Sequence, residues 1–216
     1  MTPDLQPPHP LQFRGSSCAR LALRWMGWQA DFDGLPTPQG VVVVYPHTSN
    51  WDFVVGLLLK WSLGVPLQFW AKDSLFRIPL FGRWLAWLGG VPVNRKSSHG
   101  VVGQMARLMA EKKQKNEYFW LALSPEGTRG YTPGWRSGFY RVALEAGVPV
   151  GLAGLDYARK KLVLRHFVQL TGDEPADMTR IADALGDCQG LRPNKAAPVR
   201  LPHLHRPATD TMLEQR

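Results

Sequence analysis

The sequence predicts a single α/β domain whose largely parallel or mixed central sheet is flanked by helices and preceded by an N-terminal amphipathic helix. Two observations support this fold class. Strand-like and helix-like stretches alternate from residue 41 to residue 157, an order that favours a largely parallel sheet. The chain has 216 residues, which is long enough for one domain with a substantial core.

Residues 1–30 are expected to hold a disordered start followed by an amphipathic, membrane-facing helix. Residues 1–10 are rich in proline, a composition typical of disorder. From about Ser16 onward, leucine, tryptophan and methionine are interspersed with Arg20 and Arg24. Two interpretations are open. The helix either lies in the plane of a membrane surface or packs on the sheet and extends its arginines to solvent.

The stretch 41–52, VVVVYPHTSNWD, predicts a buried strand, a turn and the beginning of a helix. Four consecutive valines suit a strand that is covered on both faces, and the proline after them has no N–H to donate to a sheet. Ser49 or Asn50 is a suitable N-cap, which puts Asp52 in the first helical turn. His47 therefore lies at the carboxyl edge of a strand, where open α/β sheets bind ligands.

The remaining elements continue the alternation within a domain predicted to span residues 38–188. From residue 189 to residue 216, the density of proline and polar residues predicts a poorly ordered tail. Strands are expected at 66–72, 91–95, 118–124, 148–157 and 159–170, and helices at 53–65, within 73–90, and at 97–117, 137–147 and 173–188.

The charge distribution favours an anionic membrane surface as a partner. Residues 11–172 carry 20 lysines and arginines against 9 acidic residues, a balance of +11, whereas the whole chain carries +9. The nine tryptophans lie among leucine, valine and phenylalanine, which is typical of membrane interfaces rather than of nucleic-acid binding.

Other features limit the compartment and the chemistry. Cys18 and Cys188 lie far apart and in no motif, so we expect a reducing compartment and no disulfide framework. Neither C-x-x-C nor H-E-x-x-H occurs, so no metal site is predicted. The sequence contains neither a secretory signal pattern nor a run of about 18 apolar residues. We therefore expect a cytoplasmic protein that binds peripherally to the cytoplasmic face of the cell membrane.

Four blocks, in this order and at these separations, carry a resemblance to a known family. They are VVVVYPHTSNWD at 41–52, GGVPVNR at 89–95, SPEGTRG at 124–130 and GVPV at 147–150. Together they resemble the glycerolipid acyltransferases of the lysophosphatidate acyltransferase type, whose H-x-x-x-x-D pattern is matched by His47 and Asp52.

The resemblance implies the transfer of a fatty acyl group from a thioester to the hydroxyl of a lysophospholipid-like acceptor or related lipid alcohol, in phospholipid biosynthesis or remodelling. Acyl-CoA or acyl-carrier protein would be the co-substrate, and no further cofactor is expected. An anionic membrane surface is the expected macromolecular partner, and nucleic acid is not.

His47 is the candidate general base, because a hydroxyl that attacks a thioester must lose its proton as the bond forms. It is also the only group in these blocks that titrates near neutral pH. Asp52 would fix its tautomer by accepting a hydrogen bond. The chain contains no G-x-S-x-G, and Ser49 is better explained as a cap, so the substrate's alcohol takes the place of an enzyme serine.

The predicted substrate-binding residues are Arg95, Glu126, Gly127, Thr128 and Arg129. The planar fork of arginine suits phosphate, and the resemblance implies that Arg95 and the E-G-T-R block hold the acceptor phosphate. Gly127 lets the backbone approach a ligand closely and Thr128 offers a hydroxyl. Glu126 either orients an arginine or binds a glycerol hydroxyl, and a surface salt bridge is an equally good account of Arg95.

Several alternatives are open at this point. A lipid esterase or thioesterase would use the same dyad on water. A non-catalytic protein would bind anionic lipid or nucleic acid through its charge and tryptophans alone. The apolar residues within 73–90, which include Trp84 and Trp87, either belong to the core or line an acyl-chain tunnel.

Overall fold

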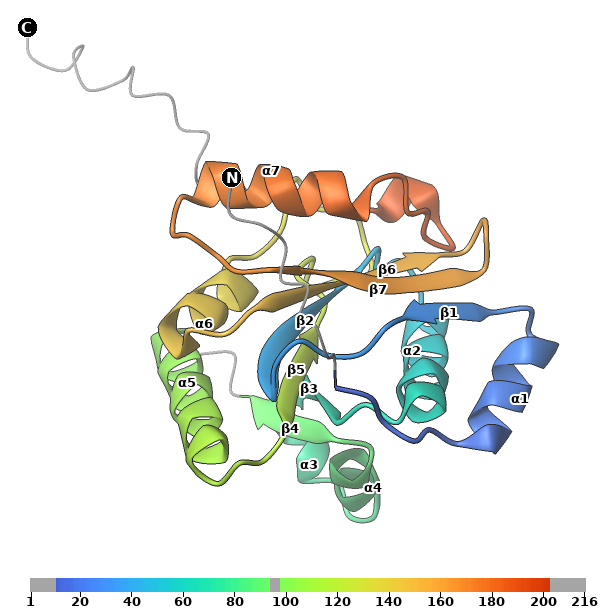
Figure 1. The fold of residues 1–216 in the computed structure, drawn as a ribbon, viewed down its shortest axis with the longest axis horizontal. Coiled ribbons are helices and arrows are strands. Elements are labelled where there is room, and N and C mark those ends of the chain that lie inside the picture. Colours follow the sequence, from blue (N-terminus) through green and yellow to red (C-terminus); the bar gives the residue numbers. More distant parts are fainter. Residues whose placement is uncertain (1–10, 94–97, 203–216) are drawn as a thin grey trace, which may run out of the picture.

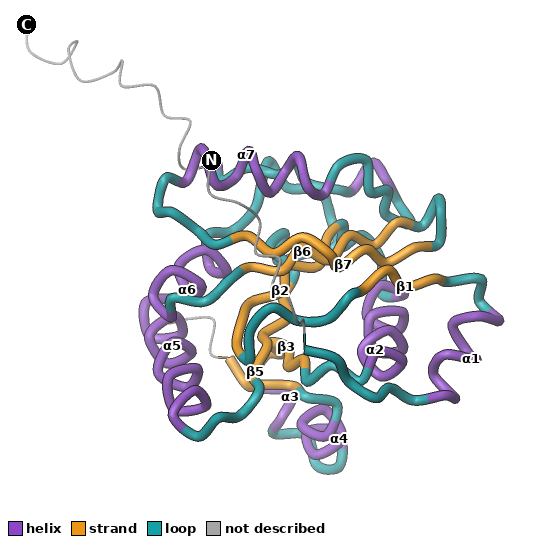
Figure 2. Tube along the Cα trace, viewed as in Figure 1, coloured by secondary structure: helices purple, strands orange, loops and turns teal. Residues whose placement is uncertain are grey.

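The computed structural model describes residues 11–93 and 98–202. These residues form a mixed seven-stranded sheet with helices packed on both faces (Figures 1 and 2). The strand order is β1-β7-β6-β2-β5-β3-β4. The predicted α/β fold, with a central sheet between helices, is confirmed.

The strand predicted from the four valines, β2 (Gln39–Tyr45), lies in the middle of the sheet. Its neighbours β5 (Phe119–Leu123) and β6 (Val150–Asp156) both run parallel to it. Beyond β5 lie the parallel strands β3 (Leu67–Lys72) and β4 (Gly90–Val93). Because these strands all run the same way, their carboxyl ends share one edge of the sheet.

The two strands at the other end of the sheet, β7 and β1, run in the opposite direction to this group. β7 (Lys161–Val168) runs antiparallel to β6, and β1 (Gln29–Phe32) pairs in parallel with β7. β7 agrees with the strand expected within 159–170, whereas β1 was not predicted. β1 is four residues long and has no fully buried residue, so its sequence shows little of the alternation that identifies a strand. The folded domain therefore begins before the predicted residue 38.

Helices cover both faces (Figure 1), and the side chains of β2 alternate between the two cores that they form. Val41 and Val43 lie in the core with α5, α6 and α7, whereas Val42 lies in the core with α1 and α2. The helices are α1 (Ser17–Trp25), α2 (Trp51–Leu63), α3 (Asp73–Phe76), α4 (Phe81–Trp87), α5 (Ser98–Gln114), α6 (Gly138–Ala146) and α7 (Glu174–Leu185), with a short 3-10 turn η1 (Pro193–Lys195).

Helix α1 packs on α2 with one face and exposes the other. Leu23 is buried, and the Arg20 guanidinium donates to the Ser62 carbonyl of α2 at 3.2 Å. Leu21 and Trp25 are 56% and 86% exposed on the outer side. The inner face of this helix thus packs on the domain, and the placement of its outer face on a membrane surface stays a prediction. Residues 1–10, predicted to be disordered, lie outside the described residues.

The prediction of a poorly ordered tail from residue 189 is wrong for residues 189–202, which pack on the domain. Ala197 and Leu201 are 1% and 4% exposed. Proline and polar residues suggested disorder, but the backbone N–H groups of Arg192 and Ala197 find acceptors in loops of the domain. Residues 203–216 lie outside the described part of the chain.

The apolar residues within 73–90 divide between two environments. Leu85 and Leu88 are buried, as expected for core residues, but Trp84 and Trp87 are 48% and 74% exposed. These tryptophans therefore belong neither to the core nor to an enclosed tunnel. Within the described residues, no helix combines the length and the apolar character needed to cross a membrane.

Candidate active site

The turns that follow β2 and β5 meet at the carboxyl edge of the sheet. Because Val43 pairs with Leu123, the two strands leave the sheet side by side. The backbone N–H of His47 donates to Glu126 Oε2 at 2.5 Å. The structure thus brings together the first and third sequence blocks through two residues that are 79 positions apart in the chain.

His47 and Asp52 face each other across the first of these turns. His47 Nδ1 lies 3.2 Å from Asp52 Oδ2, and the two side chains are 24% and 1% exposed. The same carboxylate oxygen accepts the N–H groups of Thr48 and Ser49 at 2.7 and 2.8 Å. The imidazole is therefore held through Nδ1, and Nε2 is the ring nitrogen turned away from the carboxylate.

Helix α2 positions Asp52 without using a conventional side-chain cap. Asn50 occupies the N-cap position, but its side chain makes no cap hydrogen bond. Ser49, one residue before the N-cap, instead accepts the Trp51 N–H through its Oγ at 3.2 Å, so it orders the beginning of the helix without being the cap itself. The side chain of Asn50 accepts a hydrogen bond from Arg129.

Tyr157 completes the surroundings of Asp52 and was missed by the sequence analysis. Its hydroxyl donates to Asp52 Oδ1 at 2.7 Å, and its ring packs edge-on against Trp28. Burial and then the hydrogen bond to Asp52 raise the pKa of Tyr157 well above its usual value, so the hydroxyl remains a donor. Its position directly after β6, beside β2, is the signal that could have identified it.

The hydrogen bonds around Asp52 keep it ionised. Burial alone raises the pKa of a carboxyl group. At Asp52, hydrogen bonds from His47, Tyr157 and the backbone of the turn outweigh this effect and hold the pKa below its usual value. A buried, ionised carboxylate next to Nδ1 stabilises a positively charged imidazole.

Glu126, predicted to bind substrate, lies in the interior of the structure. It is 1% exposed, and its two oxygens accept backbone N–H groups from His47 and from Ala197, the latter at 3.0 Å. Burial raises the pKa of this carboxyl above its usual value, although both N–H groups oppose the shift. Glu126 thus holds the His47 turn, the P-E-G-T-R turn and the C-terminal segment together.

Residues 127–129 of the P-E-G-T-R turn lie closer to solvent. Thr128 and Arg129 are exposed, and the Arg129 guanidinium donates to Asn50 beside the His47 turn. Gly127 has a φ of +67°, and a Cβ there would lie 2.6 Å from Nε of Arg136. Arg136 is thus a second arginine at this turn that the sequence analysis did not select. Arg95 lies outside the described residues.

Residues 189–202, which we call the C-terminal strap, cross the loops of the site. The Tyr157 N–H donates to the Gln189 carbonyl at 2.8 Å, and the Arg192 N–H donates to Thr48 Oγ1 at 3.2 Å. Gly190 lies against Thr48, where a Cβ would come within 2.6 Å of Oγ1. The strap therefore contacts Thr48, which follows His47 in the chain, and Tyr157, whose hydroxyl donates to Asp52.

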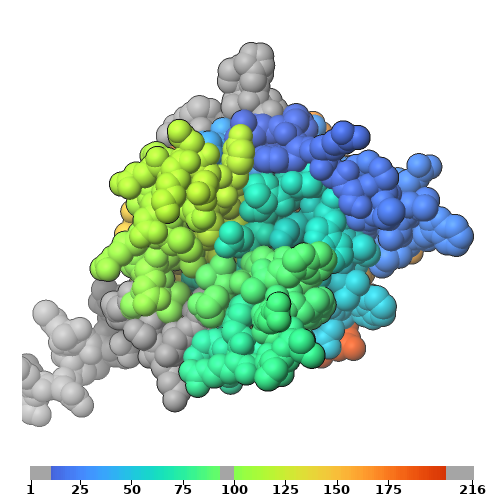
Figure 3. All heavy atoms as spheres, turned by 90° about the horizontal axis from the view of Figure 1, so that it is seen from below, coloured from blue at the N-terminus to red at the C-terminus, as the bar shows by residue number. Residues whose placement is uncertain are grey.

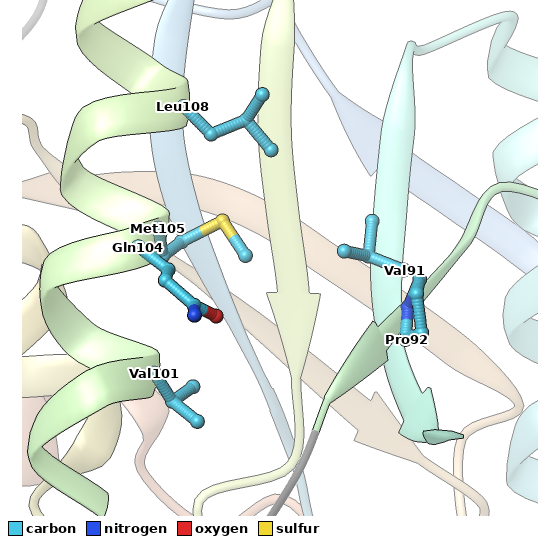
Figure 4. Close-up of a pocket in the computed structure, with 6 residues that line it drawn as sticks. All are labelled: Val91, Pro92, Val101, Gln104, Met105 and Leu108. Carbon is cyan, nitrogen blue, oxygen red and sulfur yellow. The ribbon is translucent and has the colours of Figure 1, made fainter. Parts of the chain in front are cut away.

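An apolar cavity of about 130 Å³ lies between β4 and α5 (Figure 4). Gln104 is the polar side chain among its six lining residues, and the labelled side chains from the two elements face one another across it. These residues do not include His47 or Asp52. The cavity is lined by Val91, Pro92, Val101, Gln104, Met105 and Leu108.

In the described part of the chain, no group of three or more histidine, cysteine or acidic side chains could hold a metal ion.

This chain is similar to known proteins in sequence and in structure. The sequence model of a family described as Acyltransferase matches residues 31–151. The chloroplastic 1-acyl-sn-glycerol-3-phosphate acyltransferase BAT2 of Brassica napus is 28% identical over 126 residues, which cover 57% of this chain and 36% of that protein. The chloroplastic 1-acyl-sn-glycerol-3-phosphate acyltransferase LPAT1 of Arabidopsis thaliana is 30% identical over 107 residues, which cover 48% of this chain and 29% of that protein.

The match thus spans about a third of the length of each of these curated relatives. Among solved structures, the 1-acyl-sn-glycerophosphate (LPA) acyltransferase PlsC from Thermotoga maritima aligns with a TM-score of 0.49 at 19% identity. That alignment covers 77% of this chain and 73% of the PlsC chain.

Proposed function

The chain belongs to the acyltransferase family, whose sequence model matches more than half of it, and on this premise we propose that it transfers a fatty acyl group from a thioester to a lysophospholipid-like acceptor. The observation that carries the proposal is the 3.2 Å contact between His47 Nδ1 and a carboxylate oxygen of Asp52. The curated relatives are named for acylation of 1-acyl-sn-glycerol-3-phosphate, and a phosphorylated lysolipid is the acceptor that we propose here.

In the proposed mechanism, His47 Nε2 takes the proton of the acceptor hydroxyl as the hydroxyl oxygen bonds to the thioester carbonyl carbon. Asp52 stabilises the imidazolium that forms. The carbon–sulfur bond then breaks, and the imidazolium returns the proton to the leaving thiolate. The products are the acylated lipid and a free thiol, so no external acid or base is consumed.

Direct transfer between the two substrates accounts for the surroundings of the dyad better than a covalent acyl-enzyme does. Ser49 is the serine nearest to His47 in the sequence, but it is 5% exposed and its oxygen accepts the Trp51 N–H. The sequence has no G-x-S-x-G, the pattern that presents a nucleophilic serine on a sharp turn. The nucleophile is therefore the acceptor's own hydroxyl.

We assign the acceptor phosphate to the exposed arginines beside the dyad. Arg129 reaches Asn50 in the same turn as His47, and Arg136 lies over Gly127. A guanidinium group can hold two phosphate oxygens at once. Arg95, which the family resemblance assigns to the same phosphate, is kept as a third candidate.

The proposed setting is the cytoplasmic face of the cell membrane, with acyl-CoA or acyl-carrier protein as the donor. This part rests on the balance of +11 over residues 11–172 and on the apolar face that α1 exposes. Basic residues near an anionic surface gain about 1 kcal/mol each.

Incubation of the purified protein with labelled acyl-CoA or acyl-carrier protein and a panel of lysolipids tests the proposal. We expect labelled diacyl product from a phosphorylated lysolipid. Free fatty acid in place of lipid product would identify a thioesterase or esterase that uses water. Absence of both products with either donor would favour a non-catalytic lipid or nucleic-acid binding protein.

A further inference from the structure

Residues 73–88, which we call the α3–α4 hairpin, present large apolar side chains to solvent. Phe81 and Trp84 contact each other, with ring centroids 5.5 Å apart. Exposed apolar surface of this kind marks a site of protein or membrane interaction. The exposed residues are Leu80 (78%), Trp87 (74%), Ile78 (49%), Trp84 (48%) and Phe81 (39%).

This exposure does not come from a loosely attached hairpin. Its inner side chains, Leu85 and Leu88, are 5% and 1% exposed. Lys60 of α2 donates to the Leu88 carbonyl at 2.7 Å, and Trp61 of α2 packs against one side of Trp87. The hairpin is thus fixed on the domain by one face, and its other face has no cover among the described residues.

Leu80, at the tip of the hairpin, adopts a conformation that leucine rarely takes. Its φ is +63°, in the region that favours glycine. The most exposed apolar side chain of the hairpin therefore sits on its least favourable backbone position. Strained positions of this kind cluster at functional sites, and packing inside the domain does not explain this one.

The charges around the apolar face match an anionic surface. Lys72, Arg77 and Arg83 are exposed, and the hairpin carries one acidic residue, Asp73, which lies 3.4 Å from Arg77. Residues 72–88 thus carry three basic groups against one acidic group, or +2. An apolar centre with tryptophan and a basic rim suits the headgroup region of an anionic bilayer.

The hairpin also begins at the edge of the sheet that holds the dyad. α3 follows directly after β3, which runs parallel to β5, and β5 runs parallel to β2. Seen from below, α3 and α4 (green) form a broad exposed surface beside α2, with α1 (blue) on the same side (Figure 3). On α2, Trp51 is 57% exposed one residue before Asp52.

We propose that the α3–α4 hairpin inserts Leu80 and Trp84 into the interface of an anionic bilayer and thereby seats the active-site edge on the membrane. This inference rests on the proposed function, because a lysolipid acceptor has to be reached from its bilayer. The contact itself can be measured without turnover, so the two proposals can fail separately.

Cosedimentation with vesicles of phosphatidylglycerol and phosphatidylcholine in equal parts tests the proposal. Leu80→Gly and Trp84→Ser should each weaken vesicle partitioning about tenfold, because each removes one buried apolar side chain from the bound state. Leu80→Gly should fold at least as well as the wild type, since glycine accepts a φ of +63°. Leu144→Ser, an exposed leucine (40%) on α6, is the matched control and should partition like the wild type.

Four outcomes would overturn the proposal. The wild type fails to bind these vesicles, the hairpin variants bind as well as the wild type, or Trp25→Ser on α1 abolishes binding while the hairpin variants keep it. In the fourth, the hairpin variants separate a dimer into monomers and still bind vesicles, which would identify a protein interface.

Turnover of a dispersed short-chain acceptor should be unchanged in the hairpin variants. If no variant and no wild type turns over any acceptor, the proposed function fails while the vesicle result stands.

Discussion

The hydroxyl of Tyr157 lies 2.7 Å from Asp52 Oδ1, so the carboxylate that holds His47 is itself held from the end of a neighbouring strand. The other oxygen, Oδ2, contacts the imidazole and two backbone N–H groups. Both carboxylate oxygens of Asp52 are thus held by hydrogen-bond donors. The dyad is preorganised by β2, α2 and β6 together.

Tyr157→Phe should destabilise the protein by about 1.5–3 kcal/mol at neutral pH, the usual value of a hydrogen bond to a charged group. The pKa of Asp52 is lowered in the folded state. Its stabilising contribution is therefore present above the usual pKa of aspartate and is lost as the pH falls through the folded value. The difference in unfolding free energy between wild type and variant should accordingly shrink in acid.

Urea unfolding across this pH range checks the prediction, with Tyr131→Phe, an exposed tyrosine (63%), as the control. A difference that does not change with pH would show that Tyr157 stabilises the fold by packing alone. The variant should also lower kcat, but by less than loss of the base itself, because His47 keeps its contact with Asp52.

Glu126→Gln should cost about 1–3 kcal/mol of stability and lower kcat. Both carboxylate oxygens accept N–H groups, and an amide would turn its own NH₂ toward one of them. Glu145→Gln, an exposed residue of α6, controls for the change of charge. If Glu126→Gln instead raised only the KM for the acceptor and left unfolding unchanged, the residue would contact substrate as the sequence suggested.

Gly190→Ala tests whether the C-terminal strap positions the dyad. The new methyl group would lie 2.6 Å from Thr48 Oγ1, so the strap or the His47 turn has to move. We expect a loss of about 1–3 kcal/mol in stability and a fall in kcat with little change in KM. Gly56→Ala is the control, because a Cβ there meets nothing within 4 Å, and it should stabilise α2 by about 0.5–1 kcal/mol. Unchanged kcat in Gly190→Ala would mean that the strap does not position the site.

Arg129→Lys should raise the KM for a phosphorylated acceptor by about 10- to 100-fold, the effect of losing one hydrogen bond between charged groups. The KM for the acyl donor and the turnover of an acceptor without phosphate should change little. Steady-state kinetics with both acceptors provides the measurement, and Arg141→Lys, at an exposed arginine of α6, is the control. An equal loss toward donor and acceptor would assign Arg129 a structural role beside Asn50.

The sequence predicted the part of the site that depends on local pattern. Four valines followed by proline defined β2, and the helix signal after Asn50 placed Asp52 beside His47. Because parallel strands end at one edge, the P-E-G-T-R block could be expected near this turn, and Arg129 does contact Asn50.

The parts that could not be predicted depend on contacts between distant segments. Tyr157 hydrogen-bonds Asp52, which lies 105 residues away in the chain, and no sequence motif includes this tyrosine. The strap resembled disorder because proline-rich segments carry no periodic pattern, although its N–H groups find acceptors on Thr48 and Glu126. Glu126 was predicted to contact a ligand because a charged residue in a loop usually faces solvent. In the structure its carboxylate instead accepts the backbone N–H groups of His47 and Ala197.

The rate of acyl transfer by His47→Ala tests the central claim most directly. The labelled acyl-CoA assay should be run on wild type and variant with the acceptor that the wild type uses best, after both are shown to unfold alike. The account predicts a loss of about 100-fold or more, because a general base contributes at least that much. Turnover close to that of the wild type, in a folded variant, would contradict the assignment of His47 as the base and the mechanism built on it.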